Sequence, residues 1–140
     1  MNARIVIPAR LDSSRLPGKV LADLDGQPVL AHVIAAAQAS EVGEVWVASD
    51  AAEVLEIATA LGANAVRTRS DHQSGSDRIA EVARREKWAD QEMIVNLQGD
   101  EPFMPAALLR AVADLLADSP DADWATVAAP LTDPELWADP

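Results

Sequence analysis

Short apolar runs alternate along this chain with longer stretches in which apolar residues return every three or four positions. The short runs are rich in β-branched residues and predict strands at residues 5–7, 44–48, 65–67, 93–97 and 124–129. The longer stretches predict helices at residues 28–39, 50–61, 76–87 and 105–117. Because strands and helices alternate, the pattern predicts a single α/β domain over residues 1–140. We expect an open, mostly parallel sheet with helices on both faces.

Local signals support the ends of two of these helices. Asp50 with Glu53 three residues later has the pattern of a capping box, which favours a helix start at that point. Gly62 suits the position just past the end of the same helix. Pro28 suits the first turn of the preceding helix, so that helix is expected to begin there.

Polar residues gather in three loops, which follow the first, third and fourth predicted strands. The first loop, residues 8–19, carries three cations and two hydroxyl groups, and the second, residues 68–78, is also basic. Right-handed crossovers can bring such loops to one edge of a parallel sheet, where ligands usually bind. Cations with hydroxyl groups and backbone N–H groups suit a polyanion such as a triphosphate. The alternative is a surface loop with solvated cations.

The distribution of charge favours anion-binding loops over surface loops with solvated cations. The formal charge is −12, with 11 Lys and Arg against 23 Asp and Glu. Four cations lie in the first nineteen residues and six between residues 67 and 87. This clustering in an acidic chain predicts two local anion sites. It excludes the broad basic face of a nucleic-acid-binding protein, so no nucleic acid partner is expected.

The third loop, residues 98–102, places Asp100 and Glu101 just past an apolar strand. Gly99 permits a backbone bend, and Pro102 restricts Glu101 to an extended conformation. Mg²⁺ takes one or two protein carboxylates and completes its shell with water and phosphate oxygens. The loop therefore predicts a Mg²⁺–phosphate site. The alternative is that Asp100 or Glu101 caps the next helix or faces solvent.

Several other classes of protein are excluded. The glycines are scattered, so there is no dinucleotide-binding G-x-G-x-x-G, and a Walker A pattern fails at Ser13 and Val20. The absence of cysteine rules out disulfides and thiol chemistry. His32 is expected to be structural, and His72 is a weak ligand candidate. No apolar run approaches the ~20 residues of a membrane helix, and no signal peptide is present, so we expect a cytoplasmic protein with no membrane partner.

Three motifs together resemble those of the 3-deoxy-manno-octulosonate (Kdo) cytidylyltransferases, also called CMP-Kdo synthetases. The motifs are Pro8-Ala9-Arg10 with Ser14-Arg15-Leu16-Pro17-Gly18-Lys19, then Arg69-Ser70-Asp71-His72-Gln73-Ser74-Gly75-Ser76-Asp77-Arg78, and Val95-Asn96-Leu97-Gln98-Gly99-Asp100-Glu101-Pro102. The resemblance implies a nucleotide-diphospho-sugar transferase fold, like that of glycosyltransferase A. It also implies Mg²⁺-dependent transfer of CMP from CTP to Kdo, giving CMP-Kdo and pyrophosphate for lipopolysaccharide biosynthesis.

The resemblance also implies roles for individual residues. The catalytic residues would be Arg10, Lys19 and Asp100, and Asp100 would bind the metal. The residues that bind the nucleotide would be Ala9, Arg10, Ser14, Arg15, Lys19, Arg69, Ser74, Gly75, Arg78 and Gln98.

Members of this family are considerably longer than 140 residues. We therefore expect the nucleotide-binding half of the fold, with the C-terminal part missing, and a homodimer for the full-length family. Two alternatives stay open. One is a different sugar nucleotidyltransferase, acting on sialic acid or an amino analogue of Kdo, and the other is a non-catalytic nucleotide-binding or interaction module.

Overall fold

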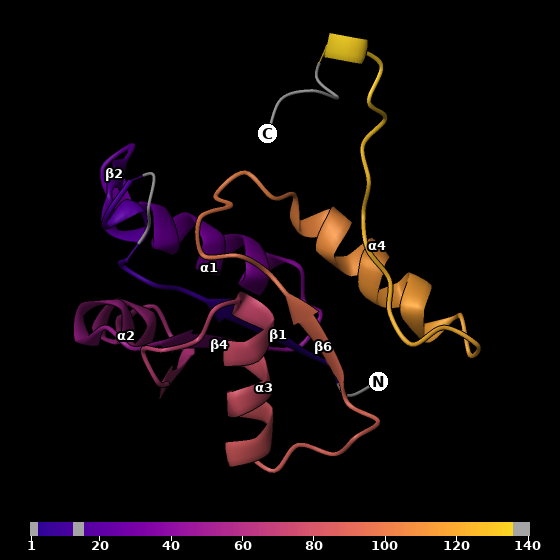
Figure 1. The fold of residues 1–140 in the computed structure, drawn as a ribbon, viewed down its shortest axis with the longest axis horizontal. Helices are drawn as coiled ribbons and strands as arrows, with labels where there is room; N and C mark the ends of the chain where they lie inside the picture. Colours follow the sequence, from indigo (N-terminus) through magenta and orange to yellow (C-terminus); the bar gives the residue numbers. More distant parts are fainter. Residues whose placement is uncertain (1–2, 13–15, 136–140) are drawn as a thin grey trace.

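A computed structural model describes residues 3–12 and 16–135. Its centre is a four-stranded parallel sheet in the order β5-β4-β1-β6 (Figure 1). The strands are β1 (Ala3–Pro8), β4 (Glu44–Ser49), β5 (Asn64–Arg67) and β6 (Met93–Asn96). A short hairpin of β2 (Asp23–Leu24) and β3 (Gln27–Pro28) follows the one-turn 3₁₀ helix η1 (Lys19–Leu21). Since the four strands are parallel, their carboxyl ends share one edge.

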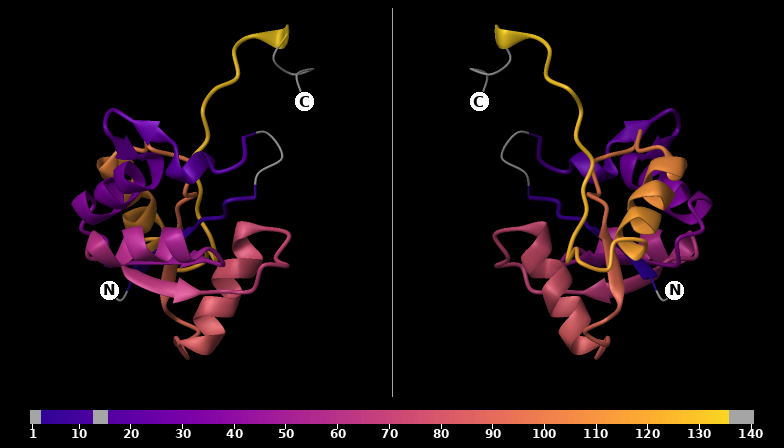
Figure 2. Two further views of the ribbon diagram at one scale, coloured as in Figure 1. Left: turned by 90° about the vertical axis from the view of Figure 1, so that its left-hand side faces the viewer. Right: turned by 90° about the vertical axis from the view of Figure 1, so that its right-hand side faces the viewer.

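Helices cover both faces of the sheet, as predicted. They are α1 (Val29–Ala39), α2 (Ala52–Ala60), α3 (Gly75–Arg85) and α4 (Ala106–Ala117). Figure 2 shows α3 on one side of the sheet, with α1 and α4 on the other.

The alternation of side chains along β1 explains this arrangement. Ile5 and Ile7 are fully buried in the larger core cluster, which includes residues of α1, α2 and α4. Val6 points to the opposite face and is buried with Ile79 and Val82 of α3. Successive residues of a strand face opposite sides, so a continuous apolar run is buried only where both faces are covered.

Two sequence predictions about local structure are wrong. Residues 124–129 form no strand, and Trp124 is 74% exposed. The apolar pattern favours an extended conformation there, but a strand also needs a backbone partner, and no described strand pairs with this segment. Asp50 does not cap α2, whose N-cap is Ala51 without a side-chain hydrogen bond. The carboxylate of Asp50, just after β4, instead faces the guanidinium of Arg78 on α3.

Candidate nucleotide-binding site

The loops after β1, β5 and β6 meet at the carboxyl edge of the sheet. The loop after β6 is held against β1 because the Gly99 N–H donates to the Pro8 carbonyl at 3.2 Å. A Cβ at Gly99 would lie 3.0 Å from the Ala9 Cβ and 3.1 Å from the Pro8 oxygen, so this close approach favours glycine. Ala9 itself is buried, and its N–H donates to the Ala48 carbonyl at 2.9 Å.

An ion pair joins the first and third loops. Lys19 Nζ lies 3.3 Å from Asp100 Oδ2, and their side chains are 44% and 46% exposed. An exposed pair of this kind contributes little to stability, and both charges stay accessible to a ligand. The structure thus brings together the cation and the carboxylate that the sequence placed 81 residues apart.

A small hollow of about 90 Å³ opens between the three loops. Its lining residues are Pro8, Arg10, His72, Ser74, Gly75, Arg78 and Gln98. Five of these seven are residues that the motifs marked for the nucleotide, so the expected gathering of the loops is seen in the structure. Two further candidates, Ser14 and Arg15, lie outside the described residues.

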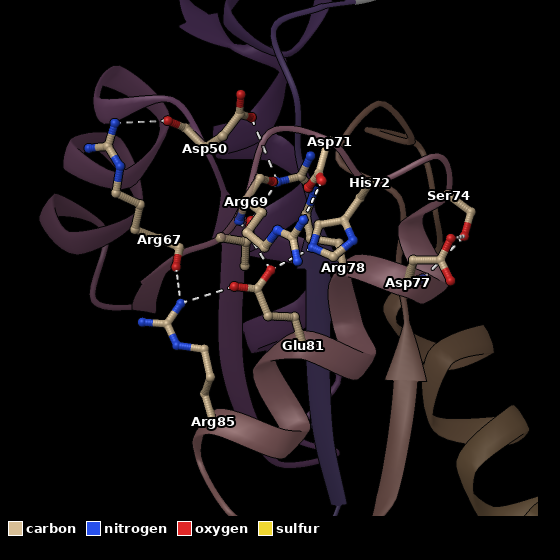
Figure 3. A network of polar contacts seen from close by, with 11 residues as sticks. Asp50, Arg67, Arg69, Asp71, His72, Ser74, Asp77, Arg78, Glu81 and Arg85 are labelled. Atoms are coloured by element: carbon tan, nitrogen blue, oxygen red, sulfur yellow. Dashed lines mark hydrogen bonds and ion pairs between the residues drawn. The ribbon is translucent and has the colours of Figure 1, made fainter.

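The arginines of the second loop differ in their surroundings (Figure 3). Arg78 is 4% exposed, and its Nη1 donates to the Thr68 hydroxyl and to the Arg69 carbonyl, the latter at 3.0 Å. The Asp50 Oδ1 lies 3.7 Å from the same nitrogen. Although Arg78 lines the hollow, this nitrogen of its guanidinium is already engaged by the protein.

Arg69 points outward instead. Its side chain is largely exposed and pairs with Asp71, and the hydrogen bond from Arg69 holds the pKa of that carboxyl below its usual value. Arg67 and Arg85 are also engaged: Arg67 donates to the Asp50 carbonyl, and Arg85 donates to the Arg67 carbonyl. Four arginines of the second basic cluster are therefore engaged by carbonyl groups and carboxylates within the protein, so their charge is partly met there.

Ser74 caps α3. Its hydroxyl accepts from the Asp77 N–H at 3.1 Å and donates to the Asp77 carboxylate at 2.9 Å. This arrangement satisfies one backbone donor of the first turn and fixes the chain direction at Gly75. The Ser-x-x-Asp spacing, a capping-box pattern, was the sequence signal that could have located the start of this helix.

A larger hollow lies elsewhere. A cavity of about 750 Å³ is lined by β6, α4 and residues 119–127, and it contains none of the candidate site residues. We place the candidate site at the loops because the charged and hydrogen-bonding groups converge there.

Comparison with known proteins identifies the family. The family model described as cytidylyltransferase matches residues 4–140. This chain belongs to the cytidylyltransferase family.

Relatives named 3-deoxy-manno-octulosonate cytidylyltransferase confirm the resemblance seen in the motifs. The protein of that name from Methylococcus capsulatus is 52% identical over 136 residues, which are 97% of this chain and 53% of the relative. The one from Idiomarina loihiensis is 47% identical over 96% of this chain and 53% of its own length. The chain spans about half the length of the curated relatives it matches.

A solved structure supports the fold. The CMP:2-keto-3-deoxy-manno-octonic acid synthetase complexed with CTP is 42% identical, with a TM-score of 0.79 over 86% of this chain and 49% of that one. A cytidylyltransferase from Leptospira borgpetersenii is 25% identical, with a TM-score of 0.72, over 86% of this chain and 51% of its own. The predicted fold is therefore confirmed for this cytidylyltransferase chain.

The donor groups fit a magnesium ion that is shared with phosphate. Among residues 3–12 and 16–135, no three His, Cys, Asp or Glu side chains cluster as a metal site. Asp100 offers an accessible carboxylate beside the cation of Lys19. A single carboxylate suits Mg²⁺, which keeps several waters and takes further oxygens from substrate phosphates.

Sequence reasoning assigned the two histidines only in part. The His32 Nε2 lies 2.6 Å from the Leu24 carbonyl, which supports the structural role expected for it. His72 lines the hollow, but its Nε2 contacts the carboxylate of Glu81. Glu81 was missed, because nothing in its local sequence marks it.

Among the helices that the structure describes, none has the length and apolar character of a membrane span.

Proposed function

We propose that this chain binds CTP together with Mg²⁺, as the nucleotide-binding part of an enzyme that transfers CMP from CTP to Kdo. The observation that carries the proposal is the meeting of three loops at one sheet edge. They place Arg10 and Gln98 in the wall of the small hollow and Lys19 beside Asp100. The relative solved in complex with CTP supports the choice of nucleotide.

The cations and the carboxylate of the site have different roles in this proposal. Arg10 and Lys19 hold the triphosphate and offset the negative charge that gathers on the departing pyrophosphate. Asp100 would hold Mg²⁺, which would supply further positive charge to the phosphates and lower the pKa of a hydroxyl bound to it. The Lys19–Asp100 ion pair is half exposed, so separating it to receive a metal–nucleotide complex costs little.

The second loop and Gln98 form the walls of the nucleotide pocket. Arg69, Ser74, Gly75 and Arg78 shape it mainly through the conformation of the loop, since Ser74 and Arg78 are engaged within the protein. The anomeric hydroxyl of the sugar acid attacks the α-phosphorus in line, and pyrophosphate leaves without a covalent enzyme intermediate. Cytoplasmic location and a homodimer remain predictions for the full-length family.

A thermal-shift titration tests nucleotide binding. CTP, UTP, GTP and ATP are each added with and without Mg²⁺. A ligand present at a hundred times its dissociation constant stabilises the folded state by about 2.7 kcal/mol. We expect a rise in Tm with CTP that depends on Mg²⁺. No shift with any nucleotide would refute the proposal for this chain.

Two variants test the residue roles. Lys19→Ala removes the cation that faces the triphosphate, and Asp100→Ala removes the metal ligand, so each is expected to weaken CTP binding by about tenfold or more. Arg84→Ala and Asp114→Ala are matched controls, because both side chains are exposed on helices away from the loops. Full Mg²⁺-dependent binding by Asp100→Ala would contradict the metal assignment.

The transfer reaction needs a separate assay. Pyrophosphate release from CTP is measured with Kdo, with sialic acid and with an amino analogue of Kdo as acceptors. We expect release with Kdo, in line with the names of the relatives. Release with another sugar acid alone would favour a neighbouring nucleotidyltransferase. Binding of CTP without release would favour a nucleotide-binding module.

A further inference from the structure

Glu81 of α3 holds two points of the second loop at once. Its Oε2 accepts from the backbone N–H of Arg69 at 3.1 Å and lies 2.5 Å from His72 Nε2 (Figure 3). Its Oε1 accepts from Arg85 Nη1 at 3.3 Å. The side chains of Glu81 and His72 are only 13% and 12% exposed. This is a well-enclosed carboxylate whose partners belong mainly to the loop.

Arg69 is fixed from both sides by α3. Glu81 accepts from its N–H, and Arg78, three residues earlier on the same helix, donates to its carbonyl. The conformation of the chain at Arg69 is thus set by helix side chains, although the Arg69 side chain itself stays exposed. Three residues further on, the contact with Glu81 places the His72 ring in the wall of the small hollow.

The ionisation state of Glu81 is consistent with this role. Burial raises the pKa of its carboxyl, but the hydrogen bonds from His72 and from the Arg69 N–H outweigh that effect, and the net pKa lies below the usual value. The group is a carboxylate at neutral pH, able to accept from both loop donors.

We propose that Glu81 is a positioning residue of the nucleotide pocket, which fixes residues 69–72 so that the His72 ring forms one wall. This inference rests on the proposed function, because it makes CTP binding depend on a side chain that does not itself line the hollow. Its removal releases the loop at both points, so the pocket is seldom in the conformation that binds, and the apparent dissociation constant rises accordingly.

The experiment compares three variants of the 140-residue chain. Glu81→Met removes both acceptor oxygens at similar volume. Glu81→Gln is the conservative variant, since its amide oxygen can accept from both Arg69 and His72. Val82→Ala is the matched control: Val82 is the next residue of α3 and is fully buried in a cluster with residues of β1, β4 and β5.

Two readouts separate positioning from stability. Hydrogen exchange of residues 69–73 without nucleotide reports the loop, and the dissociation constant of CTP with Mg²⁺ reports the pocket, both well below the Tm of each variant. We expect Glu81→Met to speed exchange in this segment and to weaken CTP binding about tenfold, with Glu81→Gln within about threefold of the parent. Val82→Ala should lower the Tm and leave both readouts unchanged.

Unchanged exchange in Glu81→Met would overturn the inference, and so would an equal loss of CTP affinity in Val82→Ala. If Glu81→Met does not fold, His72→Phe keeps a ring in the wall but removes the contact with Glu81, and the same outcomes apply. Failure of the parent chain to bind CTP would refute the proposed function instead, while the exchange measurement still decides whether Glu81 holds the loop.

Discussion

Replacing Arg78 with methionine is expected to destabilise the fold far more than replacing an exposed arginine. Methionine keeps an unbranched side chain and a good helix propensity, so the change removes mainly the charge and its hydrogen bonds. Arg78 is 4% exposed and donates to the Thr68 hydroxyl and the Arg69 carbonyl. The Asp50 Oδ1, 3.7 Å away, is buried and has no hydrogen-bond partner among the described residues.

The magnitude follows from these contacts. A hydrogen bond from a charged group contributes about 1.5–3 kcal/mol, and breaking a buried ion pair costs about 3–5 kcal/mol. Although Oδ1 is buried, the Asp50 side chain as a whole is 34% exposed, so water at the rest of the carboxylate relieves part of the second cost. We therefore expect a net loss of about 2–4 kcal/mol. In a domain of this size, that loss lowers the Tm by about 6–12 °C.

Thermal melts of a double-mutant cycle provide the assay. Asp50→Asn removes the carboxylate that Arg78 faces, so Arg78→Met should cost less in that background, with a coupling free energy of about 1 kcal/mol. Arg84→Met, at an exposed position of the same helix, is the control and should change stability by less than about 0.5 kcal/mol.

Two results would refute this reasoning. If Arg78→Met melts within about 2 °C of the parent, the guanidinium does not hold the second loop. If the two substitutions at positions 50 and 78 are additive, Asp50 is not an energetic partner of Arg78, and the loop is fixed by the Thr68 and Arg69 contacts alone.

Two further predictions concern packing and pH. Gly43→Ala places a Cβ 1.8 Å from the Ala3 carbonyl oxygen, so it should cost more than about 3 kcal/mol in a urea melt; a variant as stable as the parent would show that β1 can shift freely. Because the folded-state pKa of Glu81 lies below its ordinary value of 4.5, its stabilising contribution is present above pH 4.5 and is lost as the pH falls through the folded-state pKa. Urea melts across this range should show a smaller acid-induced loss for Glu81→Gln, and equal losses in both proteins would contradict the assignment.

Much of the fold could be predicted because the core strands are short, apolar and separated by polar loops. The runs around residues 5–7 and 93–97 became β1 and β6, each with its polar loop at the carboxyl end. The β2–β3 hairpin was missed because two-residue strands are too short to show a period of two. Residues 124–129 were mistaken for a strand because an apolar pattern carries no information about a pairing partner.

The meeting of the three loops was also predictable, since parallel strands end at a common edge. The burial and the partners of each cation at that edge could not be predicted from the sequence. Arg69 and Arg78 lie nine residues apart in one basic motif, yet the first is exposed in the loop and the second is buried on α3. Their partners differ, because Arg78 contacts Thr68, the Arg69 carbonyl and Asp50, whereas the Arg69 side chain pairs with the exposed Asp71. Asp50 also explains the wrong prediction at α2. Its spacing to Glu53 has the pattern of a capping box, but in the structure its carboxylate faces Arg78.

The distinction between the two basic clusters changes how the site is understood. In the second cluster, Arg67, Arg78 and Arg85 donate to carbonyl oxygens of neighbouring segments, so their positive charge mainly ties the loop to the sheet and to α3. The first loop instead presents Arg10 at the hollow and Lys19 in an exposed ion pair. The recognition of phosphate should therefore depend on the first cluster, and the shape of the pocket on the second. Substitutions in the second loop are accordingly expected to affect the stability and the nucleotide affinity together, whereas Lys19→Ala should lower the affinity at almost unchanged stability.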